Sequence, residues 1–83
     1  MNNVQPRLYV KEGCPWCHEA SEFLDRHKIP YERIVVTGDH TAMNEMVKVS
    51  GQSKAPTLRW NGKVLADFGV EELEAFLKKE GAI

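Results

Sequence analysis

The stretch Lys11-Glu12-Gly13-Cys14-Pro15-Trp16-Cys17 holds both cysteines of the chain and lies where a strand pattern gives way to a helix pattern. The preceding Arg7–Val10 is short, β-prone and partly apolar. The following Trp16–His27 has apolar residues at the spacing of an amphipathic helix. We therefore expect Cys14 at the N-terminus of a helix and Cys17 one turn further along.

This position favours the ionised form of Cys14. Pro15 suits the first helical position, because the N–H that proline lacks is not needed there. Free backbone N–H groups and the positive end of the helix dipole stabilise an anion, so we expect the pKa of the Cys14 thiol to lie below that of a free thiol. Lys11 is cationic and close in sequence, so its charge is one candidate to add to this effect. Residues three apart on a helix are neighbours, so a Cys14–Cys17 disulfide is sterically feasible, with Cys14 the exposed attacking thiol and Cys17 the shielded resolving thiol.

Length and composition predict one small globular domain, residues 1–83. The 83 residues are 42% hydrophobic and 28% charged, which is ordinary for a globular protein. A net charge of -1 indicates neither a nucleic-acid nor a membrane partner, and no apolar run is long enough to span a bilayer. Met1–Pro6 lacks the features of a signal peptide, so we expect a cytoplasmic location. In reducing cytosol a lone Cys-x-x-Cys pair is typical of catalysis rather than of a permanent bridge.

The remaining pattern predicts seven elements in the order β-α-β-α-β-β-α. The strands are expected near Arg7–Lys11, Tyr31–Val36, Thr57–Trp60 and Lys63–Phe68, and the helices near Pro15–His27, His40–Val49 and Val70–Lys79. The two βα crossovers imply parallel strands, and the Asn61-Gly62 turn of a two-residue hairpin adds an antiparallel pair. The fold class is therefore α/β, a four-stranded mixed sheet with helices on both faces.

Apolar spacing also predicts the core. The side chains expected to face it are Cys17, Ala20, Phe23 and Leu24 on the first helix, Met43, Met46 and Val47 on the second, and Val70, Leu73, Phe76 and Leu77 on the third. The apolar run Ile34–Val36 indicates burial on both faces, as in an inner strand of a covered sheet.

The chain resembles a glutaredoxin, the small branch of the thioredoxin-fold family, over nearly its whole length. The family motif Lys-x-x-Cys-Pro-aromatic-Cys is matched by Lys11 to Cys17, with tryptophan where tyrosine is commoner. The family segment Gly-x-x-Thr-Val-Pro is similar to Gly51–Pro56, and Asn61-Gly62 matches the hairpin that follows. The resemblance implies a thioredoxin fold and a cis peptide at Ala55–Pro56.

The resemblance also implies a set of site residues. Cys14 and Cys17 are the catalytic pair. The free backbone groups of Ala55, before Pro56, would pair with an extended substrate such as the cysteinyl part of glutathione. Trp16 lies between the two cysteines on the first turn. It has two possible roles there: an exposed lid that contacts substrate, or an aromatic side chain of the core.

Lys11 has two readings of similar weight. One is a solvated surface charge; the other is a role in thiolate stabilisation and carboxylate binding. For Pro56 the alternative to a cis bond is an ordinary trans loop proline.

The segment that holds glutathione in the family is altered here. The family usually has Gly-Gly after the last strand and then an acidic pair that holds the amino end of glutathione. The corresponding stretch, Ala66–Glu72, differs from this pattern. The acidic candidates for the contact are Asp67, Glu71 and Glu72.

These observations predict a dithiol thiol–disulfide oxidoreductase that reduces protein disulfides and glutathione mixed disulfides. Glutathione is expected as co-substrate, with no permanently bound cofactor and no metal. The expected partners are disulfide-containing proteins and a reductant, either glutathione or a thioredoxin-reductase-type enzyme. We expect a monomer.

Three alternatives stay open at this point. One is a glutaredoxin-like electron donor of the ribonucleotide reductase type, served by thioredoxin reductase. Another is an iron–sulfur cluster bridged between two subunits with glutathione, which Pro15 disfavours. The third is covalent haem, because Cys14–His18 fits Cys-x-x-Cys-His with Met43 or Met46 as second axial ligand. The strand content and the absence of an export signal weigh against haem.

Overall fold

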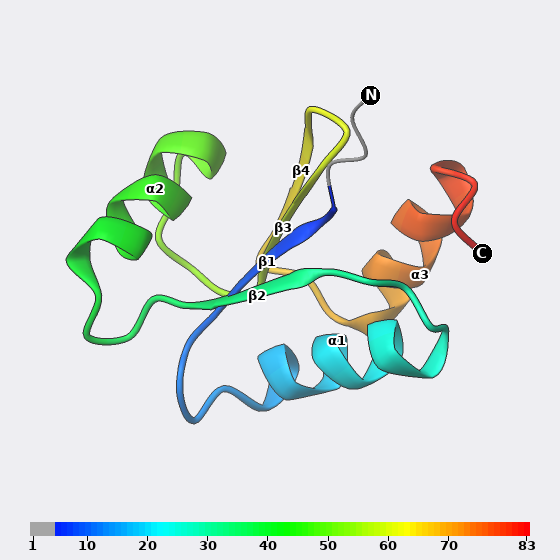
Figure 1. Ribbon diagram of the computed structural model, residues 1–83, viewed down its shortest axis with the longest axis horizontal. Coiled ribbons are helices and arrows are strands. Elements are labelled where there is room, and N and C mark those ends of the chain that lie inside the picture. Colours follow the sequence, from blue (N-terminus) through cyan, green and yellow to red (C-terminus); the bar gives the residue numbers. More distant parts are fainter. Residues whose placement is uncertain (1–4) are drawn as a thin grey trace.

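The computed structural model describes residues 5–83 and has the expected order of elements (Figure 1). The elements are β1 (Arg7–Val10), α1 (Pro15–Arg26), β2 (Glu32–Val35), α2 (His40–Ser50), β3 (Thr57–Trp60), β4 (Lys63–Ala66) and α3 (Val70–Lys79). The strand order is β2-β1-β3-β4. β1 pairs with β2 in parallel and with β3 antiparallel, and β3 and β4 form the hairpin. The four-stranded mixed sheet predicted from the sequence is therefore confirmed.

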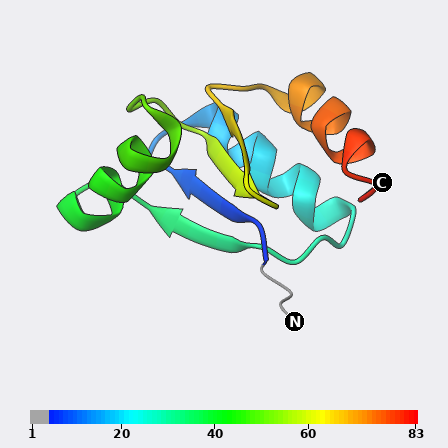
Figure 2. The same ribbon diagram turned by 90° about the horizontal axis from the view of Figure 1, so that it is seen from above.

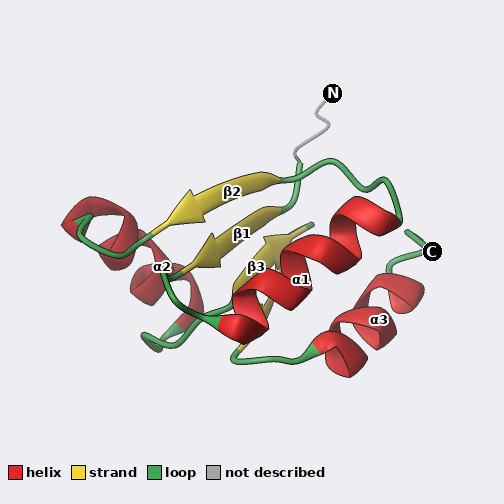
Figure 3. Cartoon of the chain, turned by 90° about the horizontal axis from the view of Figure 1, so that it is seen from below, coloured by secondary structure: helices red, strands yellow, loops and turns green. Residues whose placement is uncertain are grey.

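Helices cover both faces of the sheet, as expected. α1 and α3 lie side by side over one face, and α2 lies on the other side (Figures 2 and 3). Alternate residues of β1 serve the two sides: Leu8 and Val10 join the core under α1 and α3, and Tyr9 joins the core under α2. Among residues 5–83, none of the helices is both long enough and apolar enough to cross a membrane. Met1–Val4, the start of the segment considered as a signal peptide, lies outside the described residues.

The expectation that Ile34–Val36 marks an inner strand is wrong. β2 lies at the edge of the sheet, and the inner strands are β1 and β3; in β1, Leu8, Tyr9 and Val10 are all 0% exposed. Both β2 and β3 pair with β1, so the β3–β4 hairpin extends the sheet on the side of β1 away from β2. The run is apolar because its residues serve two cores: Val35 packs towards α1 and α3, and Ile34 and Val36 pack towards α2.

One side chain of α2 also differs from expectation. Met46 is fully buried and Met43 packs against the same cluster, as predicted, but Val47 is 39% exposed. Ala42 takes part in the core instead. Ala42 and Met46 are four residues apart and so lie one above the other on the face that meets Tyr9. Val47, one position further round the helix, turns towards solvent.

The chain changes direction at residues whose backbone adopts the left-handed conformation. Gly51 ends α2 with φ 73°, in the left-handed region that favours glycine, and its N–H donates to the carbonyl of Val47. Asn61 and Gly62 both have positive φ, 54° and 74°, as the two-residue hairpin turn requires. After these two reversals β3 lies beside β1, and β4 lies beside β3.

The carboxylate of Glu80 joins the hairpin to the end of α3. Asn61 Nδ2 donates to its Oε1 at 3.2 Å, and Lys63 Nζ donates to its Oε2 at 2.7 Å. The Glu80 side chain is 6% exposed, although Lys63 remains largely in solvent. The hydrogen bond from Lys63, followed by that from Asn61, lowers the pKa of the Glu80 carboxyl from its usual 4.5.

We predict that Glu80→Gln destabilises the protein at neutral pH and flattens its acid denaturation. Because the folded-state pKa is the lower one, the carboxylate stabilises the fold above about pH 4.5, and this contribution is lost as the pH falls through the folded pKa. Urea unfolding from pH 7 to pH 3 measures the effect. Glu74→Gln, which removes only an i,i+4 pair with Lys78, is the control. Equal pH dependence in wild type and Glu80→Gln would contradict the prediction.

Candidate active site

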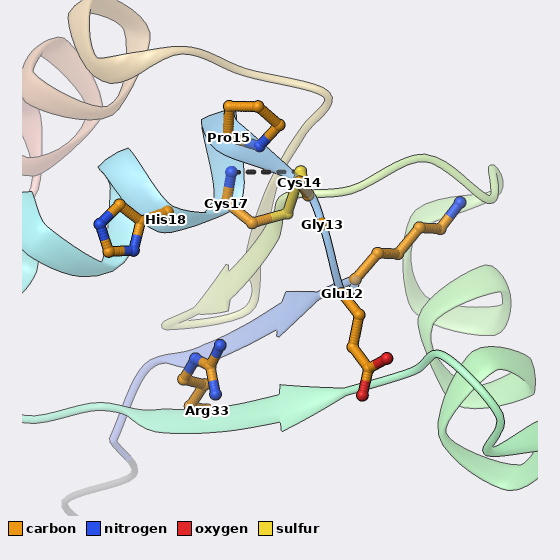
Figure 4. A pocket seen from close by; sticks show the side chains of 8 residues that line it. Glu12, Gly13, Cys14, Pro15, Cys17, His18 and Arg33 are labelled. Atoms are coloured by element: carbon orange, nitrogen blue, oxygen red, sulfur yellow. Dashed lines mark hydrogen bonds between the residues drawn. A yellow bond between two sulfur atoms is a disulfide. The ribbon is translucent and has the colours of Figure 1, made fainter.

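Cys14 occupies the position immediately before α1. Its backbone is extended, with φ -104° and ψ 104°, and α1 begins at Pro15. The Sγ of Cys14 accepts a hydrogen bond from the backbone N–H of Cys17 at 3.2 Å (Figure 4). A sulfur atom therefore takes the place that a serine or aspartate oxygen usually takes at a helix N-cap. The placement of Cys14 at a helix N-terminus is confirmed.

The two cysteines form a disulfide, with their Cα atoms 5.2 Å apart. Cys17 is 2% exposed and belongs to the core between α1, α3 and the sheet. Cys14 is half-buried at the edge of that core. The more accessible sulfur thus belongs to the residue that sequence reasoning assigned as the attacker, and the shielded sulfur to the resolving residue.

An open pocket of about 550 Å³ lies beside the disulfide, between the first turn of α1 and strand β2 (Figure 4). Its lining includes Lys11, Glu12, Cys14, Cys17, His18 and Arg33. Lys11 lines the same pocket as the cysteine pair, and a role in thiolate stabilisation and carboxylate binding stays one of its two readings. Within residues 5–83 Lys11 makes no ion pair.

Arg33 belongs to this pocket, and sequence reasoning did not select it. The signal that would have found it is the strand register. Arg33 pairs with Leu8 of β1 in the parallel ladder, and Leu8 faces α1. Neighbouring residues of paired strands share a face, so Arg33 projects to the side of the sheet that carries Cys14.

Trp16 lies on the surface beside the cysteine pair. It is 56% exposed, so it is not the core aromatic that was the alternative. A Cβ atom placed on Gly69 would lie 3.7 Å from the Trp16 ring, so the indole packs against the chain just before α3. Trp16 and Gly69 together line a second hollow of about 360 Å³. The exposure of Trp16 is what a lid over the substrate requires, and contact between Trp16 and substrate stays a prediction.

The Ala55–Pro56 peptide is cis, as the resemblance implied. Pro56 is buried, and its carbonyl accepts the backbone N–H of Asp67 at 2.9 Å. Ala55 is half-buried and packs against the same core cluster as Cys14. The substrate-binding roles of Ala55 and Pro56 stay predictions.

Comparison with known proteins identifies the family. The family model for glutaredoxin matches residues 7–65, which include the cysteine pair and the cis peptide. This chain belongs to the glutaredoxin family. It is 33% identical to glutaredoxin 3 of Escherichia coli over 58 residues, which cover 70% of this chain and 68% of that protein.

Two further similarities support this assignment. An uncharacterised glutaredoxin-like 8.6 kDa protein of the rubredoxin operon of Clostridium pasteurianum is 27% identical over 88% of this chain and 97% of its own length. The crystal structure of the thioredoxin-like protein BC3987 is 30% identical, with a TM-score of 0.80 over 88% of this chain and all of that one (100%). The chain therefore has the thioredoxin fold and the Cys-x-x-Cys pair of a glutaredoxin-like thiol oxidoreductase.

The family match ends before the segment that holds the three acidic candidates. Asp67 Oδ2 lies 3.8 Å from Lys54 Nζ. Glu72 caps α3, because its Oε1 accepts the Gly69 N–H at 3.0 Å. Glu71 is exposed on the first turn of α3 and lines the hollow beside Trp16. Of the three carboxylates, Glu71 is the one with no ion pair or side-chain hydrogen bond to another part of residues 5–83.

We predict that Cys14 ionises more readily than an unstructured cysteine. In reduced Cys17→Ser the backbone N–H of residue 17 and the dipole of α1 still stabilise the Cys14 thiolate, so its pKa should fall below that of the same thiol in denaturant. The ultraviolet absorbance of the thiolate, followed against pH, measures this. Reduced Cys14→Ser is the matched control, since its remaining thiol is buried. Equal pKa values for Cys14 in the folded and denatured protein would refute the prediction.

Proposed function

We propose that this protein is a dithiol oxidoreductase that reduces protein disulfides and glutathione mixed disulfides. The observation that carries the proposal is the hydrogen bond from the Cys17 N–H to Cys14 Sγ at the start of α1, with Cys17 shielded beneath. Hydrogen bonding to the charged form lowers a thiol pKa, and the thiolate is the species that attacks a disulfide.

The reaction follows from the positions of the two sulfurs. The Cys14 thiolate attacks one sulfur of the substrate disulfide; that bond breaks, and the departing sulfur leaves as a thiolate that takes a proton from water. Cys14 is now joined to the substrate. Cys17, whose Cα is 5.2 Å from that of Cys14, attacks Cys14 Sγ and releases the second substrate thiol. Two electrons have passed to the substrate, and the enzyme is left with the Cys14–Cys17 disulfide.

Glutathione completes the proposed cycle. Two molecules of glutathione reduce the Cys14–Cys17 disulfide and leave as glutathione disulfide; a mixed disulfide of Cys14 with glutathione is resolved in the same way by a second glutathione. No permanently bound cofactor takes part in these steps. We place the cycle in a reducing cytoplasm, with the protein acting as a monomer in electron transport and cell redox homeostasis.

The groups around Cys14 would position the substrate. The backbone of Ala55 would pair with the main chain next to the attacked cysteine, by strand addition. The indole of Trp16 offers an apolar surface beside the sulfur. Lys11, on the loop before Cys14, would attract a carboxylate. Glu71 is the acidic side chain free to meet the amino end of glutathione.

We predict opposite consequences for the two cysteine substitutions. Cys14→Ser should abolish reduction of every disulfide, because no accessible nucleophile remains. Cys17→Ser should keep activity on glutathione mixed disulfides, which a second glutathione can resolve, and lose activity on protein disulfides. Turnover of a glutathionylated peptide and of a protein disulfide is measured for each variant. An active Cys14→Ser together with an inactive Cys17→Ser would reverse the assignment of roles.

We predict that glutathione serves as the electron donor. Glutathione with glutathione reductase in one reaction, and thioredoxin reductase in another, are offered to the same enzyme and disulfide, with NADPH consumption as the readout. Turnover with glutathione alone is the expected result. Turnover only with thioredoxin reductase would identify the protein as an electron donor of the ribonucleotide reductase type. An absorbance spectrum of anaerobically purified protein tests for an iron–sulfur cluster in the same preparation.

A further inference from the structure

The pocket between α1 and β2 is distinct from the hollow beside Trp16, where the proposed function places the amino end of glutathione. It is lined by residues before Cys14, by the first turn of α1 and by Arg33 of β2. The hollow beside Trp16 is lined by a different set of residues, most of them at the start of α3. The two share no lining residue. A group that binds in the α1–β2 pocket therefore approaches Cys14 from the side of the edge strand.

The α1–β2 pocket is predominantly basic. Lys11, His18 and Arg33 supply nitrogen groups, and Glu12 supplies the one carboxylate of its lining. The imidazole of His18 is held by Glu22, with His18 Nε2 3.1 Å from Glu22 Oε2. Arg33 is exposed and makes no ion pair with any of residues 5–83.

Arg33 is fixed in place by the sheet rather than by a partner side chain. Its backbone belongs to the β1–β2 ladder, in register with the fully buried Leu8. Figure 4 shows its guanidinium extending from β2 towards the first turn of α1, where Cys17 and His18 lie. A guanidinium is always charged and presents a planar set of donors that matches a carboxylate. Arg33 thus offers a permanent anion-binding group beside the reactive disulfide.

We infer that the α1–β2 pocket receives the side-chain carboxylate of an aspartate or glutamate in the substrate polypeptide, close in sequence to the cysteine that Cys14 attacks. The inference rests on the proposed function and names the class of protein substrate. An extended chain advances about 3.3–3.6 Å per residue. An acidic residue within three positions of the attacked cysteine therefore lies within about 10 Å of Cys14. Arg33 is then a specificity-determining residue.

A polypeptide carboxylate is favoured over those of glutathione by the position of the pocket. Of the side chains and backbone groups that the proposed function gives to glutathione, Ala55 and Glu71 lie outside the α1–β2 pocket and Lys11 lines it, so Arg33 is left for another carboxylate. A chain that continues beyond the attacked cysteine can extend to Arg33. A tripeptide whose ends are already bound cannot.

Charge reversal at Arg33 tests the inference. Wild type, Arg33→Glu and Arg33→Gln are reduced, and stopped-flow tryptophan fluorescence follows a single turnover with disulfide-linked dimers of a cysteine peptide, in which the sulfur that Cys14 attacks always belongs to the peptide. The peptides differ only in aspartate or lysine next to the cysteine. Wild type should prefer the aspartate peptide, and Arg33→Glu should lower its rate about three- to tenfold and raise that of the lysine peptide, since an exposed pair is replaced by a repulsion. Arg33→Gln should remove the preference, and salt should weaken it in wild type.

Arg59→Glu is the matched control. Arg59 is also an exposed strand arginine, but it follows Leu58, which faces α1 and α3, so it lies on the opposite face of the sheet. Its reversal changes the net charge equally and should leave the peptide preference intact. Circular dichroism tests whether each variant is folded. If Arg33→Glu does not fold, the peptide preference of Arg33→Gln tests the inference.

Three results would overturn the inference. One is an unchanged peptide preference in both Arg33 variants. Another is an equal shift in Arg59→Glu, which would assign the effect to net charge. The third is an equal slowing of Arg33→Glu on the mixed disulfide of glutathione and cysteamine, in which glutathione supplies all the carboxylates, because the carboxylate would then belong to glutathione. A wild-type protein inactive on every disulfide would instead refute the proposed function itself.

Discussion

The hydrogen bond from the Cys17 N–H to Cys14 Sγ is the contact on which the site depends. It forms because α1 begins at Pro15, which leaves Cys14 extended and its sulfur over the first turn. The same geometry sets the two cysteines three residues apart on one helix, within disulfide reach. Reactivity and recyclability of the pair thus come from one local structure, the start of a helix.

The rest of the fold holds that helix start in place. β1 is an inner strand and is buried on both faces, so the loop that leaves it starts from a well-anchored part of the sheet. α1 is anchored along one side by Ala20, Phe23 and Leu24, in the same cluster as Cys17. On the far side of the sheet, α2 covers Tyr9. The cysteine pair therefore lies at the end of a rigid strand and on a packed helix, while its sulfur-bearing edge stays open.

The sequence predicted those parts of the structure that depend on neighbours along the chain. The Cys-x-x-Cys helix start, the order of elements and the Asn61-Gly62 hairpin are local, and each was predicted correctly. The edge position of β2 was not predicted, because strand order is decided by pairings between distant segments. An apolar run has the same pattern in an inner strand and in an edge strand that has a core on each face. Arg33 was missed for the same reason: only its register with Leu8 brings it to the cysteine pair.

The reactivity of Cys14 and the specificity for its substrate thus depend on different parts of the chain: reactivity on neighbours in sequence, and specificity on distant segments. The backbone groups that we expect to stabilise the Cys14 thiolate belong to its own helix. The surfaces beside it are contributed by elements far away in sequence: the start of α3 on one side, with the exposed carboxylates of Glu71 and Glu72, and β2 on the other, with Arg33. These surfaces carry opposite charge. In the proposed function a substrate that reaches Cys14 is oriented by the fields on its two sides, and we expect exchange of surface residues to redirect the protein to other disulfides without changing the thiol chemistry.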